Sequence, residues 1–265
     1  MNAVNIIVCV KQIADPEGPP SAFKVAPEGN RVTVTGIPPV ISPFDENALE
    51  AAMCIKDIHQ CKITVISLGR NLAKAVLRKS LAVGGDELLL LEDEVFEDLD
   101  SYSTALTLAT AIKKIGEYDL IFTGRQAADW DAGQVGSGIA EILGIPSVTI
   151  ARKVELSDSK VRVERVVSDG YEVIEAPMPA LITVSNELGD LRTVNLRNLM
   201  AAQKKPVTVW KAEDLGIDPS QMRRSTLLRL STPPAREARC ESIEGQTPEE
   251  KGANLALKLR EAKIV

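Results

Sequence analysis

The sequence predicts an α/β fold: a doubly wound, mostly parallel sheet with an antiparallel hairpin extension and a C-terminal arm. Short apolar runs alternate with capped helical segments in the first half, which is the pattern of successive βα units. After residue 146 the pattern changes to alternating runs joined by tight turns, as in hairpins. Beyond residue 186 such runs become sparse, which indicates an extended C-terminal region.

The first βα unit begins with an apolar run at 5–10, suited to a central parallel strand. A loop rich in proline and glycine, roughly 15–39, follows and is broken by an alternating stretch at 31–35. Ser42-Pro43-Phe44-Asp45 then has the form of a capping box with proline at the first helical position. It predicts a helix that runs to about Ile58.

Three more βα units follow in the same order. Glycines after each of these helices predict where it stops, and connections between parallel strands of one sheet are right-handed. We therefore expect a parallel sheet wrapped by helices. The expected strands are 62–68, 87–91 and 119–123, and the expected helices are 71–83, Asp100 or Ser101 to Gly116, and 133–143.

The hairpin extension is expected from alternating runs at 148–156, 161–167, 171–175 and 180–184, with turns at Asp158-Ser159 and Asp169-Gly170. A short helix at 196–203 and a strand at 207–210 come next. A polar stretch with Pro219, Pro233 and Pro234 leads to a last helix, which opens with a capping box at Thr247 and runs to about Lys263. We expect an α/β nucleotide-binding domain over 1–190 and an arm over 191–265 that packs on another protein.

The composition excludes several function classes. Aromatic residues make up 3% of the 265 residues and the net charge is −6, so we expect no nucleic-acid binding. No apolar run approaches the roughly 20 residues of a spanning helix and the start lacks a basic leader, so we expect a cytoplasmic protein without membrane insertion. The four cysteines have no zinc spacing and His59 is the single histidine, which leaves no basis for a metal site.

Ligands of doubly wound sheets bind at the carboxyl ends of the strands, and the third such end, at 123–138, carries an unusual glycine-rich segment. Its glycines allow close approach of backbone amides, and the next helix N-terminus favours phosphate. Asp129 and Asp131 are suited to ribose hydroxyls, and Gln134 or Arg125 to a phosphate or base. The alternative is that 123–138 forms only a surface loop, whose aspartates cap the next helix.

This strand end predicts a nucleotide-binding site in a Rossmann-like sheet. It matches neither the GxGxxG fingerprint nor the P-loop. We find no nucleophile with its base, so the sequence indicates a nucleotide binder without self-contained catalysis.

Five blocks in register across some 175 residues resemble the electron-transfer flavoprotein beta (small) subunit. Each block alone is a weak signal, but their order along the chain is specific. The blocks are Val8-Cys9-Val10-Lys11-Gln12, the stretch from Ser42 to Ala52, Leu81-Ala82-Val83-Gly84-Gly85-Asp86, the stretch from Gly124 to Gly136, and Asp169-Gly170-Tyr171-Glu172 through Pro179 to Val184.

The resemblance implies a heterodimer in which the alpha subunit holds a redox-active FAD. The beta subunit of this family buries a second adenine nucleotide, which is AMP in the respiratory type and a second FAD in the bifurcating type. The pocket residues implied here are Cys9, Lys11, Ser42, Pro43, Phe44, Asp45, Leu68, Gly124, Arg125, Gln126, Ala127, Asp129, Trp130, Asp131, Ala132, Gly133, Gln134 and Val135.

The resemblance also implies partners. The segment 192–200 is similar to the loop with which these proteins dock acyl-CoA dehydrogenases of fatty acid β-oxidation, and Leu196 falls at its apolar anchor. Alternatively, Leu196 packs only the short helix. Electrons would pass through the partner's FAD to a membrane quinone oxidoreductase, and the C-terminal arm would reach the alpha subunit.

The choice between AMP and a second FAD stays open at this point. Trp130 stands where bifurcating members usually have glycine, and its bulk favours AMP, although it is also suited to stack on a flavin. Ala132 and Ser137 also depart from the bifurcating pattern, whereas 124–127 and 134–136 are closer to it.

Two other classes of protein share part of this pattern. A free-standing ATP-binding sensor of the stress-protein type has the same layout but leaves the arm unexplained. An ATP-pyrophosphatase needs a Ser-Gly-Gly loop after the first strand, where this chain has Lys11-Gln12-Ile13.

Overall fold

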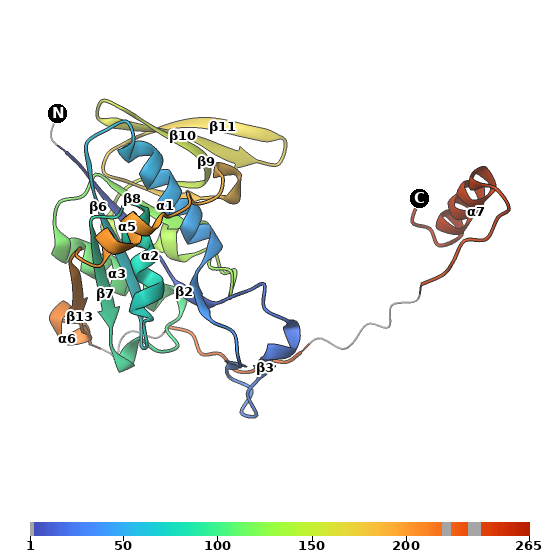
Figure 1. The fold of residues 1–265 in the computed structure, drawn as a ribbon, viewed down its shortest axis with the longest axis horizontal. Coiled ribbons are helices and arrows are strands. Elements are labelled where there is room, and N and C mark those ends of the chain that lie inside the picture. The colour runs from blue at the N-terminus through green and yellow to red at the C-terminus, as the bar shows by residue number, and fades with distance from the viewer. Residues whose placement is uncertain (1–2, 219–223, 233–239) are drawn as a thin grey trace. The chain divides into compact units, whose positions relative to one another are not determined.

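The computed structural model describes residues 3–218, 224–232 and 240–265. The chain divides into two compact units, Met1–Arg229 and Leu230–Val265, and each is described by itself (Figure 1). The domain boundary expected at residue 190 stays a prediction. Pro219, Pro233 and Pro234 of the expected polar stretch lie outside the described residues.

A nine-stranded sheet runs through the described part of the first unit, in the order β11-β10-β9-β12-β8-β1-β6-β7-β13. All pairs from β9 to β13 along this order are parallel, and β10 and β11 are added antiparallel. The predicted fold class is confirmed. The strands are β1 (Val4–Cys9), β6 (Cys61–Gly69), β7 (Glu87–Glu92), β8 (Leu120–Gly124), β9 (Ser147–Ser157), β10 (Lys160–Val167), β11 (Gly170–Pro177), β12 (Ala180–Val184) and β13 (Val207–Trp210).

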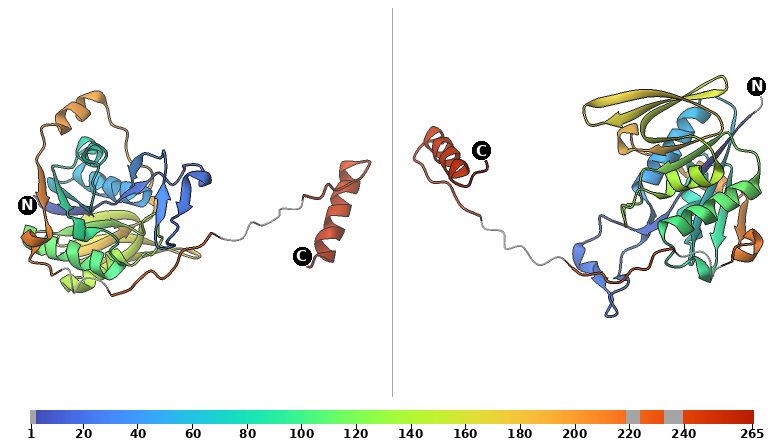
Figure 2. Two further views of the ribbon diagram at one scale, coloured as in Figure 1. Left: turned by 90° about the horizontal axis from the view of Figure 1, so that it is seen from below. Right: turned by 180° about the vertical axis from the view of Figure 1, so that it is seen from behind.

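The hairpin extension consists of β9, β10 and β11, drawn in yellow-green to yellow at one end of the sheet in Figure 2. The expectation that 180–184 belongs to this extension is wrong. That segment is β12, which lies parallel between β8 and β9. All five of its residues are buried, as a strand covered on both faces requires.

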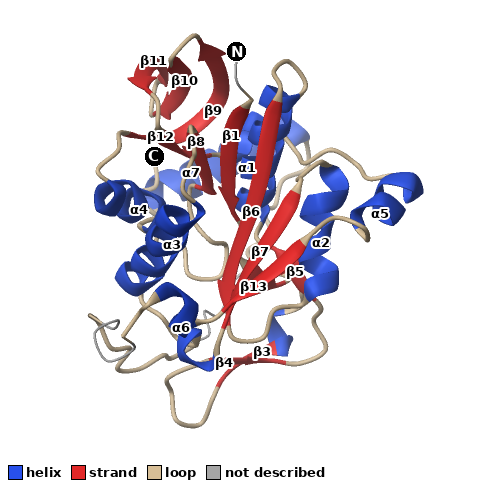
Figure 3. Cartoon of the chain, turned by 90° about the vertical axis from the view of Figure 1, so that its left-hand side faces the viewer, coloured by secondary structure: helices blue, strands red, loops and turns tan. Residues whose placement is uncertain are grey.

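Helices cover both faces of the sheet (Figure 3). Successive side chains of a strand point to opposite faces, so Ile6 and Val8 pack in one apolar cluster while Ile7 and Cys9 pack in the other. The first cluster is covered by α1 (Pro43–Lys56) and α2 (Lys74–Val83), and α5 (Leu196–Ala202) packs on α2. The second is covered by α3 (Ser101–Ile115), α4 (Val135–Leu143) and α6 (Ala212–Leu215).

The expected loop at 15–39 is partly ordered into strands. The alternating stretch forms β4 (Val32–Val34), which pairs with β3 (Phe23–Val25). At the base of the loop, β2 (Gln12–Ala14) pairs with β5 (Pro39–Ile41). The short 3-10 turns among the described residues are η1 (Pro20–Ala22), η2 (Glu94–Phe96) and η3 (Asn186–Leu188).

The helix expected from residue 71 begins at Lys74, because a distant side chain takes the hydrogen bonds of the backbone groups just before it. The side chain of Gln12 accepts a hydrogen bond from the amide of Ala73 (2.5 Å) and donates one to the carbonyl of Asn71 (3.1 Å). Contacts across 59 and 61 residues of sequence leave no local signal.

The second unit contains α7 (Pro248–Glu261). Thr247 caps it by accepting a hydrogen bond from the amide of Glu250 (3.2 Å). The carboxylate of Glu250 accepts from the amide of Gln246 (2.7 Å), one residue before the cap, so the reciprocal bond of the expected capping box is shifted by one position. No helix in the described ranges has the length and apolarity needed to cross a membrane.

Candidate functional site

The topology places the candidate site at the carboxyl end of β1. This strand lies between β6 and β8: the chain runs from β1 to β6 and β7 on one side and then crosses back to β8 on the other, so the strand order reverses at β1. Such a switch point is where open α/β sheets bind ligands. The last residue of β8 and the N-terminus of α1 meet there, which brings the segments at Lys11, Ser42–Asp45 and Gly124 together.

Asp45 joins these segments. Its buried carboxylate accepts hydrogen bonds from the amide of Lys11 (2.7 Å) and from the amide of Gly124 (2.9 Å). Burial raises the pKa of Asp45 to about 7, against the opposing effect of these two hydrogen bonds. The carboxylate therefore connects the ends of two neighbouring strands to the first turn of α1.

The capping box predicted at Ser42 is wrong. Ser42 makes no side-chain cap, and Pro43 occupies the first turn as predicted. The Ser42 hydroxyl accepts a hydrogen bond from the amide of Ala128 (3.4 Å) instead. Because the donors at Lys11 and Gly124 are buried and need acceptors, they take the carboxylate that the sequence pattern assigned to a local cap.

The loop after β8 is organised by its own side chains. Gln126 donates a hydrogen bond to the carboxylate of Asp131 (2.8 Å), and the amide of Asp131 donates to the carbonyl of Ala127 (2.9 Å). Asp131 and Gly133 have φ angles of 51° and 62°, in the left-handed region. The loop is thus folded back on itself before α4 begins at Val135.

One ion pair crosses from β1 to this loop. The ammonium of Lys11 lies 2.8 and 2.7 Å from the two carboxylate oxygens of Asp129. Both side chains are partly exposed, at 41% and 33%. The pair therefore lies at the surface of the site, where an anionic ligand is able to compete for the lysine.

Arg125 has unused hydrogen-bonding capacity. Its guanidinium lies over the ring of Phe44, 4.8 Å from the ring centre, and its buried Nε has no hydrogen-bond partner. Within the described residues no carboxylate reaches ion-pair distance of it. The buried hydroxyl of Thr123 also lacks a partner. Orphaned donors at the end of β8 suit an anionic ligand.

The N-terminus of α4 is free of a side-chain cap. Gln134 is the capping residue and makes no cap hydrogen bond. The first amides of a helix have no partner within the helix and carry its positive dipole end. Gly136 permits the close packing of this turn, since a Cβ there would lie 2.6 Å from the hydroxyl of Thr123.

The remaining predicted residues differ in exposure. Cys9 is buried, and burial first and Asp45 second raise the pKa of its thiol to about 12, so it stays protonated. Leu68 is half-buried against the cluster on the α3 side of the sheet. Trp130 is 58% exposed, and Ala132 is also exposed.

Leu196 lies apart from these residues, at the start of α5. It is 72% exposed, so it does not pack the short helix as the alternative interpretation required. Leu199 and Met200 are also exposed, at 44% and 65%. The structure thus separates a candidate nucleotide pocket from a candidate docking surface.

Sequence reasoning missed the residues of α1 that hold the segment before α5. The side-chain amide of Asn47 donates to the carbonyl of Gly189 (2.6 Å), and the carboxylate of Glu50 accepts from Arg192. Each contact spans 142 residues, so no local pattern reveals it.

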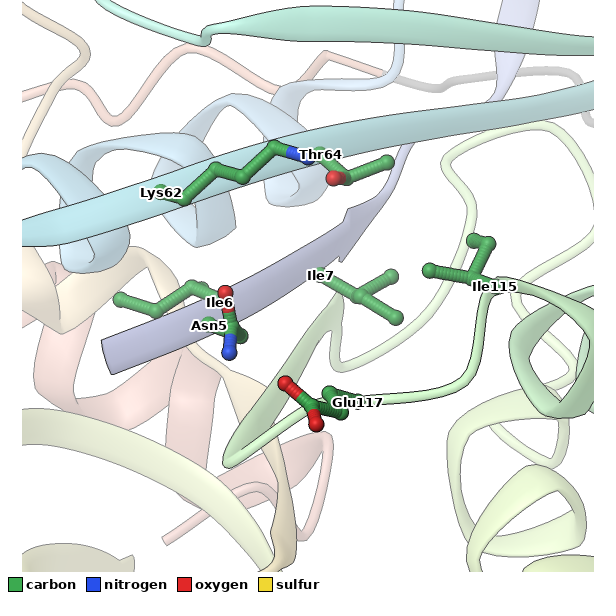
Figure 4. A pocket seen from close by; sticks show the side chains of 7 residues that line it. All are labelled: Asn5, Ile6, Ile7, Lys62, Thr64, Ile115 and Glu117. Atoms are coloured by element: carbon green, nitrogen blue, oxygen red, sulfur yellow. The ribbon is translucent and has the colours of Figure 1, made fainter. Parts of the chain in front are cut away.

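A hollow of about 280 Å³ lies at the opposite, amino-terminal end of the sheet, between β1, β6 and the end of α3. Figure 4 shows Ile7, Ile115 and Glu117 around it, with Lys62 and Thr64 from β6. Thr64 donates to Glu87 (2.6 Å), and Lys62 pairs with the same carboxylate (3.0 Å). With these polar groups already paired, this hollow is a weaker candidate than the switch point.

Comparison with known proteins identifies relatives over nearly the whole chain. The sequence model of the "Electron transfer flavoprotein domain" matches residues 31–215. The chain is 38% identical to caffeyl-CoA reductase-Etf complex subunit CarD of Acetobacterium woodii, over 99% of this chain and 100% of the relative. It is 40% identical to the electron transfer flavoprotein subunit beta of Clostridium acetobutylicum, over 83% of each chain. It is 36% identical to protein FixA of Azorhizobium caulinodans, over 81% of this chain and 78% of the relative.

Proposed function

The chain belongs to the electron transfer flavoprotein family, among its beta subunits, and we propose that it works as one half of a heterodimer with a flavin-carrying alpha subunit. Members of this family take part in electron transfer. The FAD of the alpha subunit would supply the electron chemistry. The residues of this chain would bind a second nucleotide and present a docking surface.

The nucleotide proposed for the pocket is AMP. The observation that best supports this proposal is the arrangement at the switch point. Asp45 joins the chain ends after β1 and at β8. Beside it, the N-terminus of α4 has no side-chain cap and the buried Nε of Arg125 has no hydrogen-bond partner. The residues present fit a phosphate-bearing ligand. Arg125 and the first amides of α4 would bind the phosphate. Lys11 would break its ion pair with Asp129 and pair with the ligand instead.

The proposed donors are acyl-CoA dehydrogenases, and the proposed acceptor is a membrane quinone oxidoreductase. The exposure of Leu196 supports a docking role, because a lone apolar anchor contributes much of the affinity of a small interface. The relative from Acetobacterium woodii is named as a subunit of a complex with caffeyl-CoA reductase. By analogy with this relative, an enzyme that acts on a CoA thioester is a proposed partner of this chain as well.

A second candidate is a bifurcating flavoprotein that binds a second FAD in this pocket and uses NADH. The stretches 124–127 and 134–136 favour it by their resemblance to that group. Trp130 is 58% exposed and so is available to stack on a flavin ring. The family match favours either form of subunit over a free-standing ATP sensor.

The deciding experiment is co-expression with the alpha subunit, purification and chromatography of the nucleotides released on denaturation. We expect one FAD and one AMP per heterodimer. Two FAD would establish the second candidate. Release of FAD alone, in a one-to-one ratio, would contradict a nucleotide site in this chain.

Docking is tested with Leu196→Ala in the heterodimer. We expect weaker turnover with an acyl-CoA dehydrogenase and unchanged flavin content. Val173→Ala removes a comparably exposed aliphatic side chain from β11 and serves as the control (48% exposed). Unaltered kinetics in the Leu196 variant would refute the docking role.

A further inference from the structure

Helix α5 has little packing of its own to hold it. It has seven residues, and Ala202 is the residue it buries. Isolated helices of this length are unstable in water, because too few hydrogen bonds offset the cost of nucleation. Its place must therefore come from contacts made by the chain on either side of it.

The segment before α5 is bound to α1 by Arg192. The guanidinium contacts Glu50 (Nη2 to Oε1, 2.8 Å) and Asp57 (Nη2 to Oδ2, 2.8 Å). The backbone amide of Arg192 donates to Glu50 as well (2.9 Å). Glu50 lies within α1 and Asp57 is the C-cap residue of the helix, seven positions later, so the two side chains lie on the same side, two turns from each other. One side chain thus spans two turns of a core helix.

The other end of α5 is bound to α2. Arg78 donates to the carbonyl of Ala202 (3.0 Å), and Lys205 donates to the carbonyls of Leu81 (2.9 Å) and Gly85 (2.6 Å). Asn195 caps the first turn by accepting from the amide of Asn198 (2.9 Å). Polar contacts at both ends, together with the packing of Leu191 and Val194 against the apolar core, therefore hold a helix whose outer face is apolar and exposed.

We infer that Arg192 is a positioning residue for partner docking, which holds Leu196 in place by clamping the preceding segment to Glu50 and Asp57. This inference rests on the docking role proposed for α5. Leu196 follows Arg192 by four residues, so a segment released at Arg192 would have to be ordered again whenever a partner binds. That ordering costs conformational entropy and weakens association.

Lysine is a poor substitute in this position. The planar guanidinium contacts two carboxylates at once, whereas an ammonium is a single point charge without the fork geometry. Glu50 is only 13% exposed on its side chain, so it also depends on Arg192 to offset its burial. For both reasons, lysine should not fully replace Arg192.

The test uses the purified heterodimer as electron acceptor for an acyl-CoA dehydrogenase supplied with its acyl-CoA substrate. We expect Arg192→Met to raise the apparent KM for the heterodimer about tenfold, equivalent to about 1.4 kcal/mol of binding, and to leave kcat and FAD content unchanged. Arg192→Lys should give a smaller rise, and it keeps the test valid if the methionine variant does not fold. Glu50→Gln combined with Arg192→Met should be no worse than Arg192→Met alone, since the two residues share one contact.

Lys79→Met is the matched control. It breaks the ion pair between Lys79 and Glu46 (2.6 Å), which also joins α1 to α2 but does not touch the segment before α5. A purely structural role for Arg192 predicts a loss of thermal stability in the Arg192 variant with KM unchanged in both variants, and that result would refute the inference.

Leu196→Ala separates the inference from the proposal beneath it. If this variant raises KM while the Arg192 variants do not, the positioning role alone is refuted. If Leu196→Ala leaves KM unchanged, the docking role of α5 fails and the positioning role fails with it.

Discussion

The amide of Gly124 donates a hydrogen bond of 2.9 Å to the carboxylate of Asp45, in a space that a side chain at residue 124 would fill. The two residues are 79 positions apart in the chain. Their contact brings the end of β8 against the first turn of α1 and so forms one wall of the candidate pocket.

Gly124→Ala should therefore destabilise the protein by about 3 kcal/mol and abolish nucleotide retention. Its Cβ would lie 2.6 Å from the Asp45 carboxylate and 2.7 Å from the carbonyl carbon of Phe44, so the backbone of α1 must shift. Urea unfolding and nucleotide analysis measure the two effects. Gly252→Ala is the control, because a Cβ there meets nothing within 4 Å and should raise the helicity of α7. A stable, nucleotide-loaded Gly124→Ala variant would contradict the structure.

Stability should depend on the protonation of Asp45. The pKa of this carboxyl rises to about 7 on burial, from about 4 in an unfolded chain. Between these values the folded state binds more protons than the unfolded state, so the contribution of Asp45 to stability is largest below pH about 4 and is lost as the pH rises to about 7.

We compare unfolding free energies of the wild type and Asp45→Asn at pH 5 and pH 8. The wild type should lose about 2 to 3 kcal/mol more than the variant across this interval. The charged groups that act on Asp45 are Lys11, which lowers its pKa, and Asp129, which raises it. Equal losses in both proteins would show that Asp45 does not titrate in this range.

The ion pair between Lys11 and Asp129 should matter for the ligand and little for folding. Because both side chains are partly exposed, Lys11→Met should change the unfolding free energy by less than about 1 kcal/mol. The bound nucleotide should dissociate several-fold faster, and this rate should respond less to salt. Lys160→Met, which breaks the exposed pair with Glu175 on the hairpin, is the matched control (3.3 Å). A rate unchanged relative to this control would remove Lys11 from the binding site.

Asp100 should anchor the chain at Arg224 and Ser225. One carboxylate oxygen accepts from Ser103 (amide, 2.8 Å), and the other accepts from the amides of Arg224 (2.7 Å) and Ser225 (2.6 Å). Burial would raise the pKa of Asp100, but these hydrogen bonds outweigh it and hold the pKa well below its ordinary value. Its stabilising contribution is therefore present above pH about 4 and lost as the pH falls further.

Asp100→Asn distinguishes the two roles of this carboxylate. Asparagine is a good helix cap, so α3 should remain intact. The amide group cannot accept from Arg224 and Ser225, so trypsin should cleave after Arg224 several-fold faster. Circular dichroism and timed proteolysis measure these effects, with Ser225→Ala as the milder comparison. Slow cleavage in Asp100→Asn would show that other contacts hold this segment.

The helix α1 connects the two candidate sites. Its first turn carries Asp45 of the pocket, and Glu50 with the C-cap residue Asp57 holds the segment before α5. The face between them packs in the core through residues such as Leu49 and Ala52. Both sites are therefore built on one rigid element.

Local periodicity was enough to predict the α/β fold class and the order of the main βα units, and the five motif blocks were enough to predict the family. Periodicity and caps are local properties, so the strand at 119–123 and the helix opening at Pro43 were predicted close to their observed bounds. The switch-point rule depends on topology alone, and the structure brings together the segments at Lys11, Asp45 and Gly124 that it pointed to; their role in binding a nucleotide stays a prediction.

The partners of the polar side chains could not be predicted, because they are set by contacts between distant parts of the folded chain. Asp45 was assigned to a local cap and instead accepts from two strand ends. Likewise, β12 lies in the parallel part of the sheet, and Arg192 pairs with residues more than 130 positions away. The local sequence pattern indicates which residues are buried and which segments form helices. The choice among competing hydrogen-bond donors and acceptors depends instead on which groups are buried together when the chain folds.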